Sequence, residues 1–144
     1  MKLALTVFVL GSATVVSALP CWAANLTAVD IAKTLDITSF PNSVRPGLQP
    51  RTRTLAQNGF TVIVPTARDL SSVEVHRPDR QWLFEIKIRR SSKTTAVICV
   101  LDQALNGGTY RTLDGYEVRR GRDGLLHNSG REVHDPACEM ASAP

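Results

Sequence analysis

The stretch of sequence that decides the fold is residues 81–89, which read QWLFEIKIR. Apolar and charged side chains alternate along it, and a period of two residues predicts a β-strand that buries one face. A turn follows at residues 91–93, and the nearly continuous apolar run at residues 94–101 predicts a central strand covered on both faces. The buried face of the first strand is expected to carry Trp82, Phe84, Ile86 and Ile88, and the opposite face Glu85, Lys87 and Arg89.

The segments on either side of this pair predict one helix and further strands. Thr27 can cap a helix whose apolar residues recur every three to four positions through Leu35 and which must end before Pro41. Short apolar or alternating runs predict strands at residues 60–64, 73–76, 116–119, 125–127 and 131–134, with turns at 106–108, 114–115, 123–124 and 128–130. The predicted fold class is α+β, with one N-terminal helix packed on a mostly antiparallel sheet of about six strands. The alternative is a small β-barrel or sandwich with one helix.

The first residues have the features of a secretory signal peptide. Lys2 precedes an apolar stretch at residues 3–16, Pro20 breaks any helix, and the small residues Ala23 and Ala24 suit cleavage. The predicted organisation is a signal peptide at residues 1–24, a single globular domain at 25–139 and a flexible C-terminal tail at 140–144. We therefore expect a periplasmic or secreted protein with no stable membrane anchor after cleavage. An uncleaved anchor is the alternative.

Cleavage of the signal removes Cys21 and leaves Cys99 and Cys138. Two cysteines in an exported domain most often form a disulfide, and this one would close a loop of roughly 40 residues. The loss of chain entropy in the unfolded state then stabilises the domain by about 4 kcal/mol. The competing interpretations are two free thiols and a zinc site.

The charge of the chain is mild and evenly spread. There are 17 Lys and Arg residues against 13 Asp and Glu residues, for a net charge of +4. Nucleic-acid binders usually carry a denser basic stripe with aromatic residues interleaved, whereas the arginines here alternate with acids. We therefore expect no nucleic-acid partner.

No pattern in the sequence predicts a catalytic or metal site. The spacing of His127, His134, Asp135 and Cys138 fits no common zinc motif, although these residue types are zinc ligands. A serine–histidine–aspartate set around His76 lacks the strand–turn–helix context that a nucleophile requires. We expect no catalytic residues, no metal and no cofactor.

Two groups of arginines are the most suggestive features. Arginine makes forked contacts with carboxylates and phosphates, so either group could meet an acidic protein surface. The alternative is an ordinary solvated surface, because arginines occur along most of the chain. The first group lies in a proline-rich loop and comprises Arg45, Arg51 and Arg53; the second lies at a predicted hairpin and comprises Arg119, Arg120 and Arg122.

These observations lead to one functional hypothesis and two alternatives. The hypothesis is a small exported, non-catalytic protein that binds a partner protein, in the concrete form of an inhibitor or immunity-type protein that blocks it with a loop on a rigid β scaffold. The first alternative is a small envelope hydrolase that uses His76 or His127 as general base. The second is a subunit of an envelope assembly, which a long unpaired edge strand would favour.

Overall fold

The structure, a computed structural model, describes residues 24–41 and 51–139. Apart from Ala24, the predicted signal peptide lies outside these ranges, as do Arg45 and the predicted tail at residues 140–144. The described elements are helix α1 (Ala28–Thr34), the 3-10 helices η1 (Ile37–Ser39) and η3 (Pro136–Cys138), and strands β1 (Val62–Pro65), β2 (Ser72–His76), β3 (Trp82–Ser91), β4 (Thr95–Ala104), β5 (Arg111–Arg120) and β6 (Leu126–Glu132).

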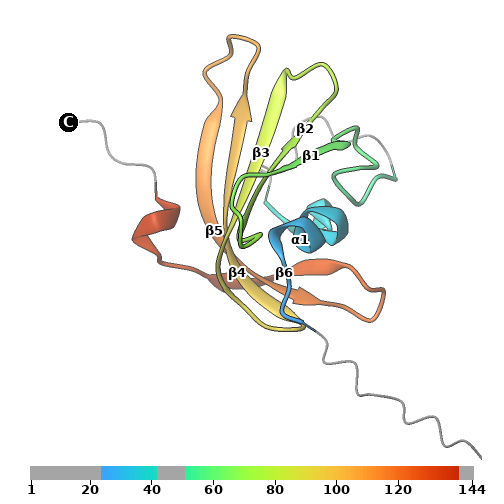
Figure 1. The fold of residues 1–144 in the computed structure, drawn as a ribbon, viewed down its shortest axis with the longest axis vertical. Coiled ribbons are helices and arrows are strands. Elements are labelled where there is room, and N and C mark those ends of the chain that lie inside the picture. The colour runs from blue at the N-terminus through green and yellow to red at the C-terminus, as the bar shows by residue number, and fades with distance from the viewer. Residues whose placement is uncertain (1–23, 42–50, 140–144) are drawn as a thin grey trace, which may run out of the picture.

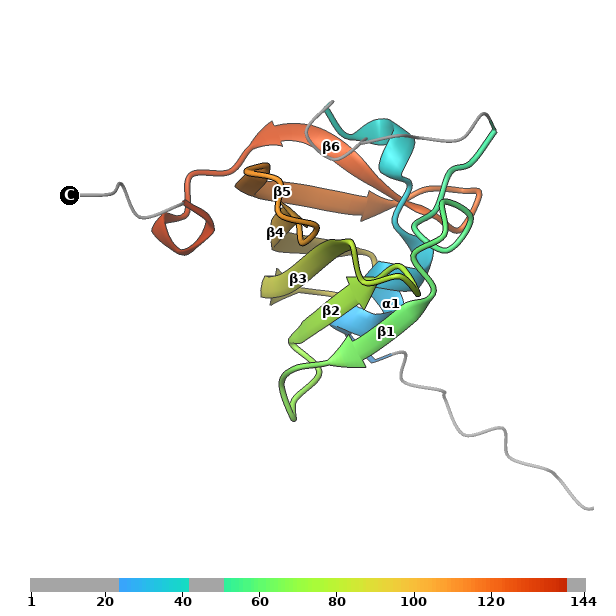
Figure 2. The same ribbon diagram turned by 90° about the horizontal axis from the view of Figure 1, so that it is seen from above.

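The six strands form one open antiparallel sheet in the order β1-β2-β3-β4-β5-β6, so that each strand pairs with its neighbours in sequence. The sheet is curved, and α1 lies inside the curve while η3 lies on the opposite side (Figures 1 and 2). We call the side that faces α1 the inner face and the other side the outer face. The α+β prediction is confirmed, and the sheet does not close into the alternative barrel.

Helix α1 forms where the capping signal predicted it. The Thr27 hydroxyl accepts from the backbone N–H of Asp30, and the Asp30 carboxylate accepts in return from the N–H of Thr27. This reciprocal cap satisfies N–H groups that the first turn of a helix leaves unpaired. The helix ends at Thr34, and Leu35 then makes a parallel bridge with Leu126 of β6. The chain leaving α1 therefore runs beside β6.

The core lies between α1 and the inner face of the sheet. Phe84 and Ile86 of β3 are buried, and Trp82 and Ile88 are partly buried and pack against the same cluster, so the predicted shared face is confirmed. Strand β4 is buried along most of its length on both faces, as its apolar sequence predicted. On its inner face are Ala96, Ile98 and Val100, and on its outer face are Val97, Cys99 and Leu101.

Two predicted turns are wrong, and both contain a glycine within a strand. Residues 128–130 do not separate two strands but form an irregularity within β6, where the pairing shifts between Tyr116–Glu132 and Val118–Asn128. Gly130 has a φ of 74°, a conformation that glycine adopts without steric cost. Gly115 lies inside β5, where the absence of a side chain leaves room for Val133. A Cβ at this position would lie only 2.9 Å from Cγ1 of Val133.

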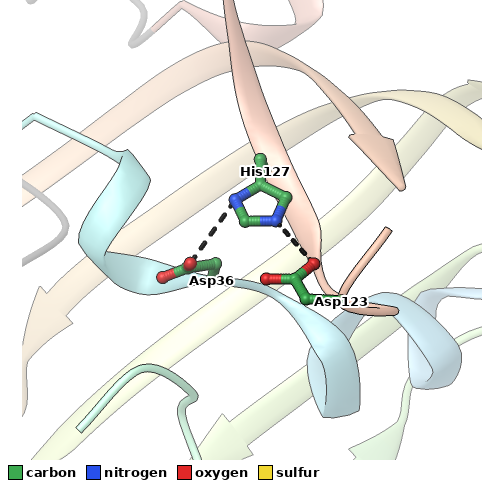
Figure 3. A group of neighbouring side chains, drawn as sticks. All are labelled: Asp36, Asp123 and His127. Carbon is green, nitrogen blue, oxygen red and sulfur yellow. Dashed lines mark hydrogen bonds and ion pairs between the residues drawn. The ribbon is translucent and has the colours of Figure 1, made fainter. Parts of the chain in front are cut away.

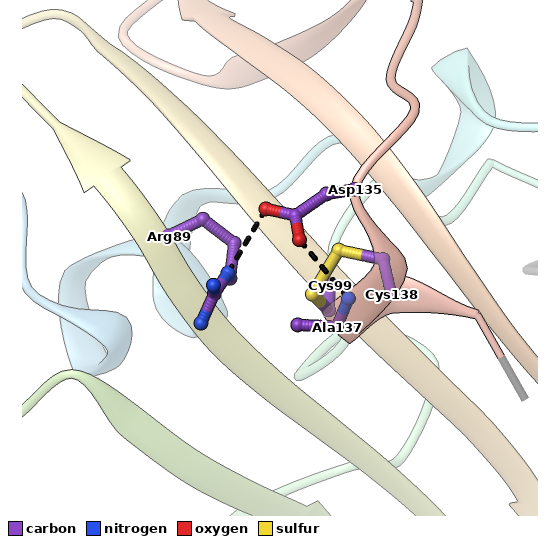
Figure 4. The surroundings of a disulfide bond; sticks show 5 residues. All are labelled: Arg89, Cys99, Asp135, Ala137 and Cys138. Atoms are coloured by element: carbon purple, nitrogen blue, oxygen red, sulfur yellow. Dashed lines mark hydrogen bonds and ion pairs between the residues drawn. A yellow bond between two sulfur atoms is a disulfide. The ribbon is translucent and has the colours of Figure 1, made fainter. Parts of the chain in front are cut away.

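The predicted disulfide between Cys99 and Cys138 is present, with the two Cα atoms 4.9 Å apart. It fastens η3 to the outer face of β4, and both cysteines are buried. Asp135 secures the same segment, since it accepts from the backbone N–H of Ala137 and forms a 3.0 Å ion pair with Arg89 (Figure 4). Both thiols are thus used in the bond, and the free-thiol and zinc interpretations do not apply.

Within the described residues, no helix combines the length and the apolar character needed to cross a membrane.

Candidate functional site

A cluster of charged side chains joins segments that are distant in the sequence, and Figure 3 shows three of its members, Asp36, Asp123 and His127. Asp36 follows α1 and caps η1, where it accepts from the backbone N–H and the hydroxyl of Thr38 at 3.0 and 2.6 Å. Asp123 lies in the hairpin between β5 and β6, and His127 lies on β6. Only 2% of Asp36 is exposed, so its carboxylate needs partners inside the protein.

Those partners are an imidazole and a guanidinium. Nδ1 of His127 lies 3.4 Å from Asp36, and Nε2 lies 2.9 Å from Asp123. The guanidinium of Arg53 forms ion pairs with both carboxylates, donating from Nε to Asp36 at 3.0 Å and from Nη2 to Asp123 at 2.8 Å. The cluster therefore links the end of α1, the segment before β1 and the β5–β6 hairpin.

The charges in this cluster compensate one another. Burial by itself raises the pKa of Asp36, but the hydrogen bonds from Thr38 and Arg53 outweigh it and hold the pKa below the usual 3.8. The hydrogen bond from His127, followed by that from Arg53, lowers the pKa of Asp123. Both carboxylates are thus ionised near neutral pH, and a fixed cation lies between them.

The geometry of the cluster suits a structural clasp better than a metal or catalytic site. Ligand atoms of Asp36, Asp123 and His127 all lie within 4.8 Å of one another, which would suit a cation. Arg53 already supplies positive charge to both carboxylates, however. Both ring nitrogens of His127 face carboxylates, so neither is directed at a substrate. A general base needs one ring nitrogen within reach of the proton that it removes.

The other histidine of the hydrolase alternative lies in a different place. His76 ends β2, and its Nε2 lies 3.1 Å from the Glu74 carboxylate, two residues earlier on the same strand. Its Nδ1 is buried and has no hydrogen-bond partner among the residues that the structure describes. No serine, threonine or cysteine side chain of the described chain forms a hydrogen bond with His76, so no nucleophile is paired with it here.

Comparisons with known proteins add no relative. No family model, no curated protein and no solved structure gives a significant match to this chain. The site must therefore be interpreted from its own geometry.

The predicted arginine groups are not equivalent. In the first group, Arg53 is committed to the Asp36–Asp123 cluster, while Arg51 is exposed. In the second group, Arg122 is exposed in the hairpin, and Arg119 and Arg120 line a cleft of about 500 Å³ next to His127. The remaining residues that line this cleft are Glu117, Gly121, Asn128, Ser129 and Arg131.

The structure brings in residues that the sequence analysis did not single out. Asp36 and Asp123 complete the Arg53 cluster, and the spacing of Asp123 four residues before His127 was a weak signal for it. Glu117 and Arg131 line the cleft because the β6 irregularity places Arg131 opposite Glu117, with 3.5 Å between Nη1 and Oε2. The local sequence does not predict that placement, because residues 128–130 have the composition of a turn.

Proposed function

We propose that this chain is an exported, non-catalytic binding protein that attaches to an acidic surface of a partner protein and blocks it, as an inhibitor or immunity-type protein does. The disulfide supports the exported part of the proposal, because such bonds persist in oxidising compartments such as the periplasm or the extracellular space. The signal-like sequence before Asn25 supports it independently. N-terminal sequencing of the exported protein should find a chain that starts near Asn25, and a chain that still starts at Met1 contradicts this part.

One observation carries the binding part of the proposal. Arg119 is exposed at the cleft beside His127, and it makes no hydrogen bond or ion pair with any residue that the structure describes. Its neighbour Arg120 is held in place by a 2.7 Å hydrogen bond from Nη1 to the carbonyl oxygen of Gly124. A free guanidinium on a rigid hairpin is suited to pair with a carboxylate of a partner.

The contacts of Arg53 argue against an interface that depends on the first arginine group. Arg53 cannot be both a partner of Asp36 and Asp123 and a free donor to another protein, so neutralising it would disturb the fold as well as any interface. Arg119 and Arg122 of the hairpin carry no such double role, since neither forms a hydrogen bond or ion pair with a residue that the structure describes. We therefore place the interface at Arg119 and Arg122, with Arg51 at its edge.

The proposal is tested by capture of the partner. The mature domain, immobilised with its disulfide oxidised, should recover a specific protein from the exported fraction of its own host. An Arg119→Gln, Arg122→Gln variant should recover much less of it, while a control with Arg68→Gln and Arg111→Gln should match the wild type. The control removes the same charge from exposed positions that line none of the clefts described here. Recovery of no specific protein by the wild type argues against the proposed function.

A hydrolase remains the second candidate because of one observation, the position of His127 in the same cleft as Ser129. It requires His127 to leave one of its two carboxylates in order to act as general base. A panel of ester, amide and glycoside substrates should show no turnover above that of a His127→Gln variant. Turnover that disappears in this variant, while its melting temperature is retained, favours the hydrolase. The assembly alternative requires a long unpaired edge strand. The edge strand β1 has only four residues and ends at Pro65, and the other edge strand, β6, is bridged by Leu35 at its start and is irregular along its length.

A further inference from the structure

The cleft at Arg119 is one part of a larger cationic surface on the outer face of the sheet. Two adjoining clefts, of about 520 and 770 Å³, share Glu117 and Arg131 with it. Arg90 lines both of these and Arg119 lines the smaller one. We call the surface formed by Arg90, Arg119, Arg131 and Glu117 the arginine face.

Arg90 reaches the outer face because β3 contains an irregularity. Simple alternation from Ile88 would direct Arg90 to the inner face, together with the apolar residues. The pairing shifts between Ile88 and Arg90, so that Arg90 pairs with Val97, whose side chain is on the outer face. Arg89, the extra residue, also points outward and pairs with Asp135. An inserted residue thus places two consecutive arginines on one side of the sheet, as β-bulges commonly re-aim side chains.

Arg131 reaches the same surface through the second irregularity. In β6, three residues lie opposite Glu117 alone, and the last of them is Arg131. Its guanidinium contacts the Glu117 carboxylate at 3.5 Å. The two irregularities flank the regular pair β4–β5 on either side, so arginines project from both borders of that pair.

The register sets the spacing of these groups. Arg90, Val97 and Glu117 are paired residues on β3, β4 and β5, so neighbours in this row lie about 4.8 Å apart at the backbone. Arg119 lies two residues beyond Glu117 on the same side of β5, roughly 7 Å along the strand. Arg131 of β6 lies opposite Glu117, so a ligand on this surface meets positive charge at both ends of a row that crosses four strands.

The arginine face keeps a net positive charge, although Asp135 at the border of the largest cleft lies close enough to Arg90 to interact with it. Arg90 and Arg119 are exposed and form no salt bridge or hydrogen bond with any of the described residues, whereas Arg131 pairs with Glu117. Three guanidinium groups thus surround one carboxylate. In the centre, Val97 is only 9% exposed and provides an apolar floor for the aliphatic part of a side chain.

We propose that the arginine face binds an extended, acidic polypeptide segment of the partner, an assignment that rests on the proposed binding function. The Glu117–Arg131 pair shows that a carboxylate fits this surface, and arginine forks match carboxylates in geometry. A single-stranded nucleic acid is disfavoured, because no Phe, Tyr or Trp lines the three clefts and base stacking has no platform.

The test uses a fluorescein-labelled decaglutamate peptide and fluorescence anisotropy with the oxidised wild-type protein at low ionic strength. The Arg90→Gln, Arg119→Gln double variant should bind the peptide about tenfold more weakly, because it loses two exposed charge pairs with the peptide. The matched control, Arg68→Gln with Arg111→Gln, removes the same charge elsewhere and should change the affinity less than about twofold. Raising the salt concentration should weaken binding of the wild type, because exposed charges are screened.

A second variant gives a result of opposite sign. Glu117→Gln removes the internal carboxylate that occupies Arg131, so the decaglutamate peptide should bind more tightly by several-fold. Glu139→Gln is the control, since Glu139 is exposed, lines none of the three clefts and carries the same charge. A gain in affinity cannot come from partial unfolding, which separates recognition from a structural role of Glu117.

Four outcomes overturn the inference. The first is absence of decaglutamate binding by the wild type, and the second is equal weakening by both arginine pairs, which would indicate net charge alone. The third is tighter binding of dextran sulfate with the same dependence on Arg90 and Arg119, which reassigns the surface to an anionic polysaccharide. The fourth separates the inference from the proposed function. If the captured partner is retained by the Arg90→Gln, Arg119→Gln variant, the inference fails and the binding function stands.

Discussion

The sharpest prediction concerns Asp102, a carboxyl group buried in the core of the sheet. Its side chain is 0% exposed and lies on the inner face of β4, where Phe84 is its partner in β3. It accepts from Nε1 of Trp82 at 2.5 Å and from the hydroxyl of Tyr110 at 3.4 Å. Both donors are neutral. Burial outweighs these hydrogen bonds and raises the pKa of Asp102 from 3.8 to about 7.

This shift makes the free energy of unfolding depend on pH. Between pH 4 and 7 the unfolded chain ionises Asp102, while the folded chain keeps it protonated. A group whose pKa is raised in the folded state contributes stability that is complete below its unfolded pKa and is lost as pH rises through its folded pKa. A shift of about 3 pKa units corresponds to about 4 kcal/mol, an upper bound for the loss between pH 4 and 8.

Asp102→Asn tests this reasoning, because an amide has the shape of the protonated acid and cannot ionise. Its oxygen can accept from Trp82 and its NH2 can donate to the oxygen of Tyr110. The variant should match the wild type at pH 4 and exceed its stability at pH 8 by up to about 4 kcal/mol. Urea unfolding of both oxidised proteins at pH 4, 6 and 8 measures the difference, in which contributions of the other acids cancel. The pKa shift is refuted if the difference in free energy of unfolding between variant and wild type is the same at all three pH values.

Three further predictions concern stability. Cys99→Ser should lower the free energy of unfolding by about 4 kcal/mol in non-reducing urea titrations, and a similar midpoint for the two proteins would contradict a stabilising role. Trp82→Ala should lower the free energy of unfolding by about 3 kcal/mol. Partial exposure of Trp82 reduces the loss relative to a fully buried tryptophan, while loss of its hydrogen bond to Asp102 adds to it; a loss below about 1 kcal/mol argues against this packing. Asp36→Ala should cost about 2–3 kcal/mol by thermal melting, because it removes the η1 cap and the buried partner of Arg53, and an unchanged melting temperature counts against the clasp.

The strands could be predicted from the sequence where apolar and charged residues alternate regularly or where an apolar run is unbroken. The alternation at residues 81–89 directs Phe84 and Ile86 to the core whatever surrounds them, and the apolar run that follows had to be covered on both faces. The cap at Thr27 is equally local, and it formed as predicted. The Cys99–Cys138 bond followed by elimination, because only two cysteines remain after the predicted cleavage.

The candidate site depends on which residues pair across neighbouring strands, and this register cannot be predicted from a short stretch of sequence. One inserted residue moves Arg90 to the opposite face, and the glycine that signals a turn at residues 128–130 instead permits the irregularity that places Arg131. Asp36 sits between two apolar residues and gave no sign that Arg53 would pair with it, 17 positions later. Asp102 follows an apolar run directly, and its burial depends on which residues of β3 and β5 lie beside it.

The bridge between Leu35 and Leu126 has a consequence for the order in which the chain can fold. Every strand pairs with its neighbour in sequence, so the sheet can zip together by short loop closures, which are fast. The segment after α1 is different, because its partner strand is the last to be synthesised. Leu35 and the following η1, which contacts β6, therefore reach their final contacts only once β6 has been made, whereas α1 itself packs on β1, β2 and β3. During synthesis the junction after α1 is thus the part of the N-terminal region with the longest wait for its final contacts, and the apolar Leu35 stays uncovered longest there.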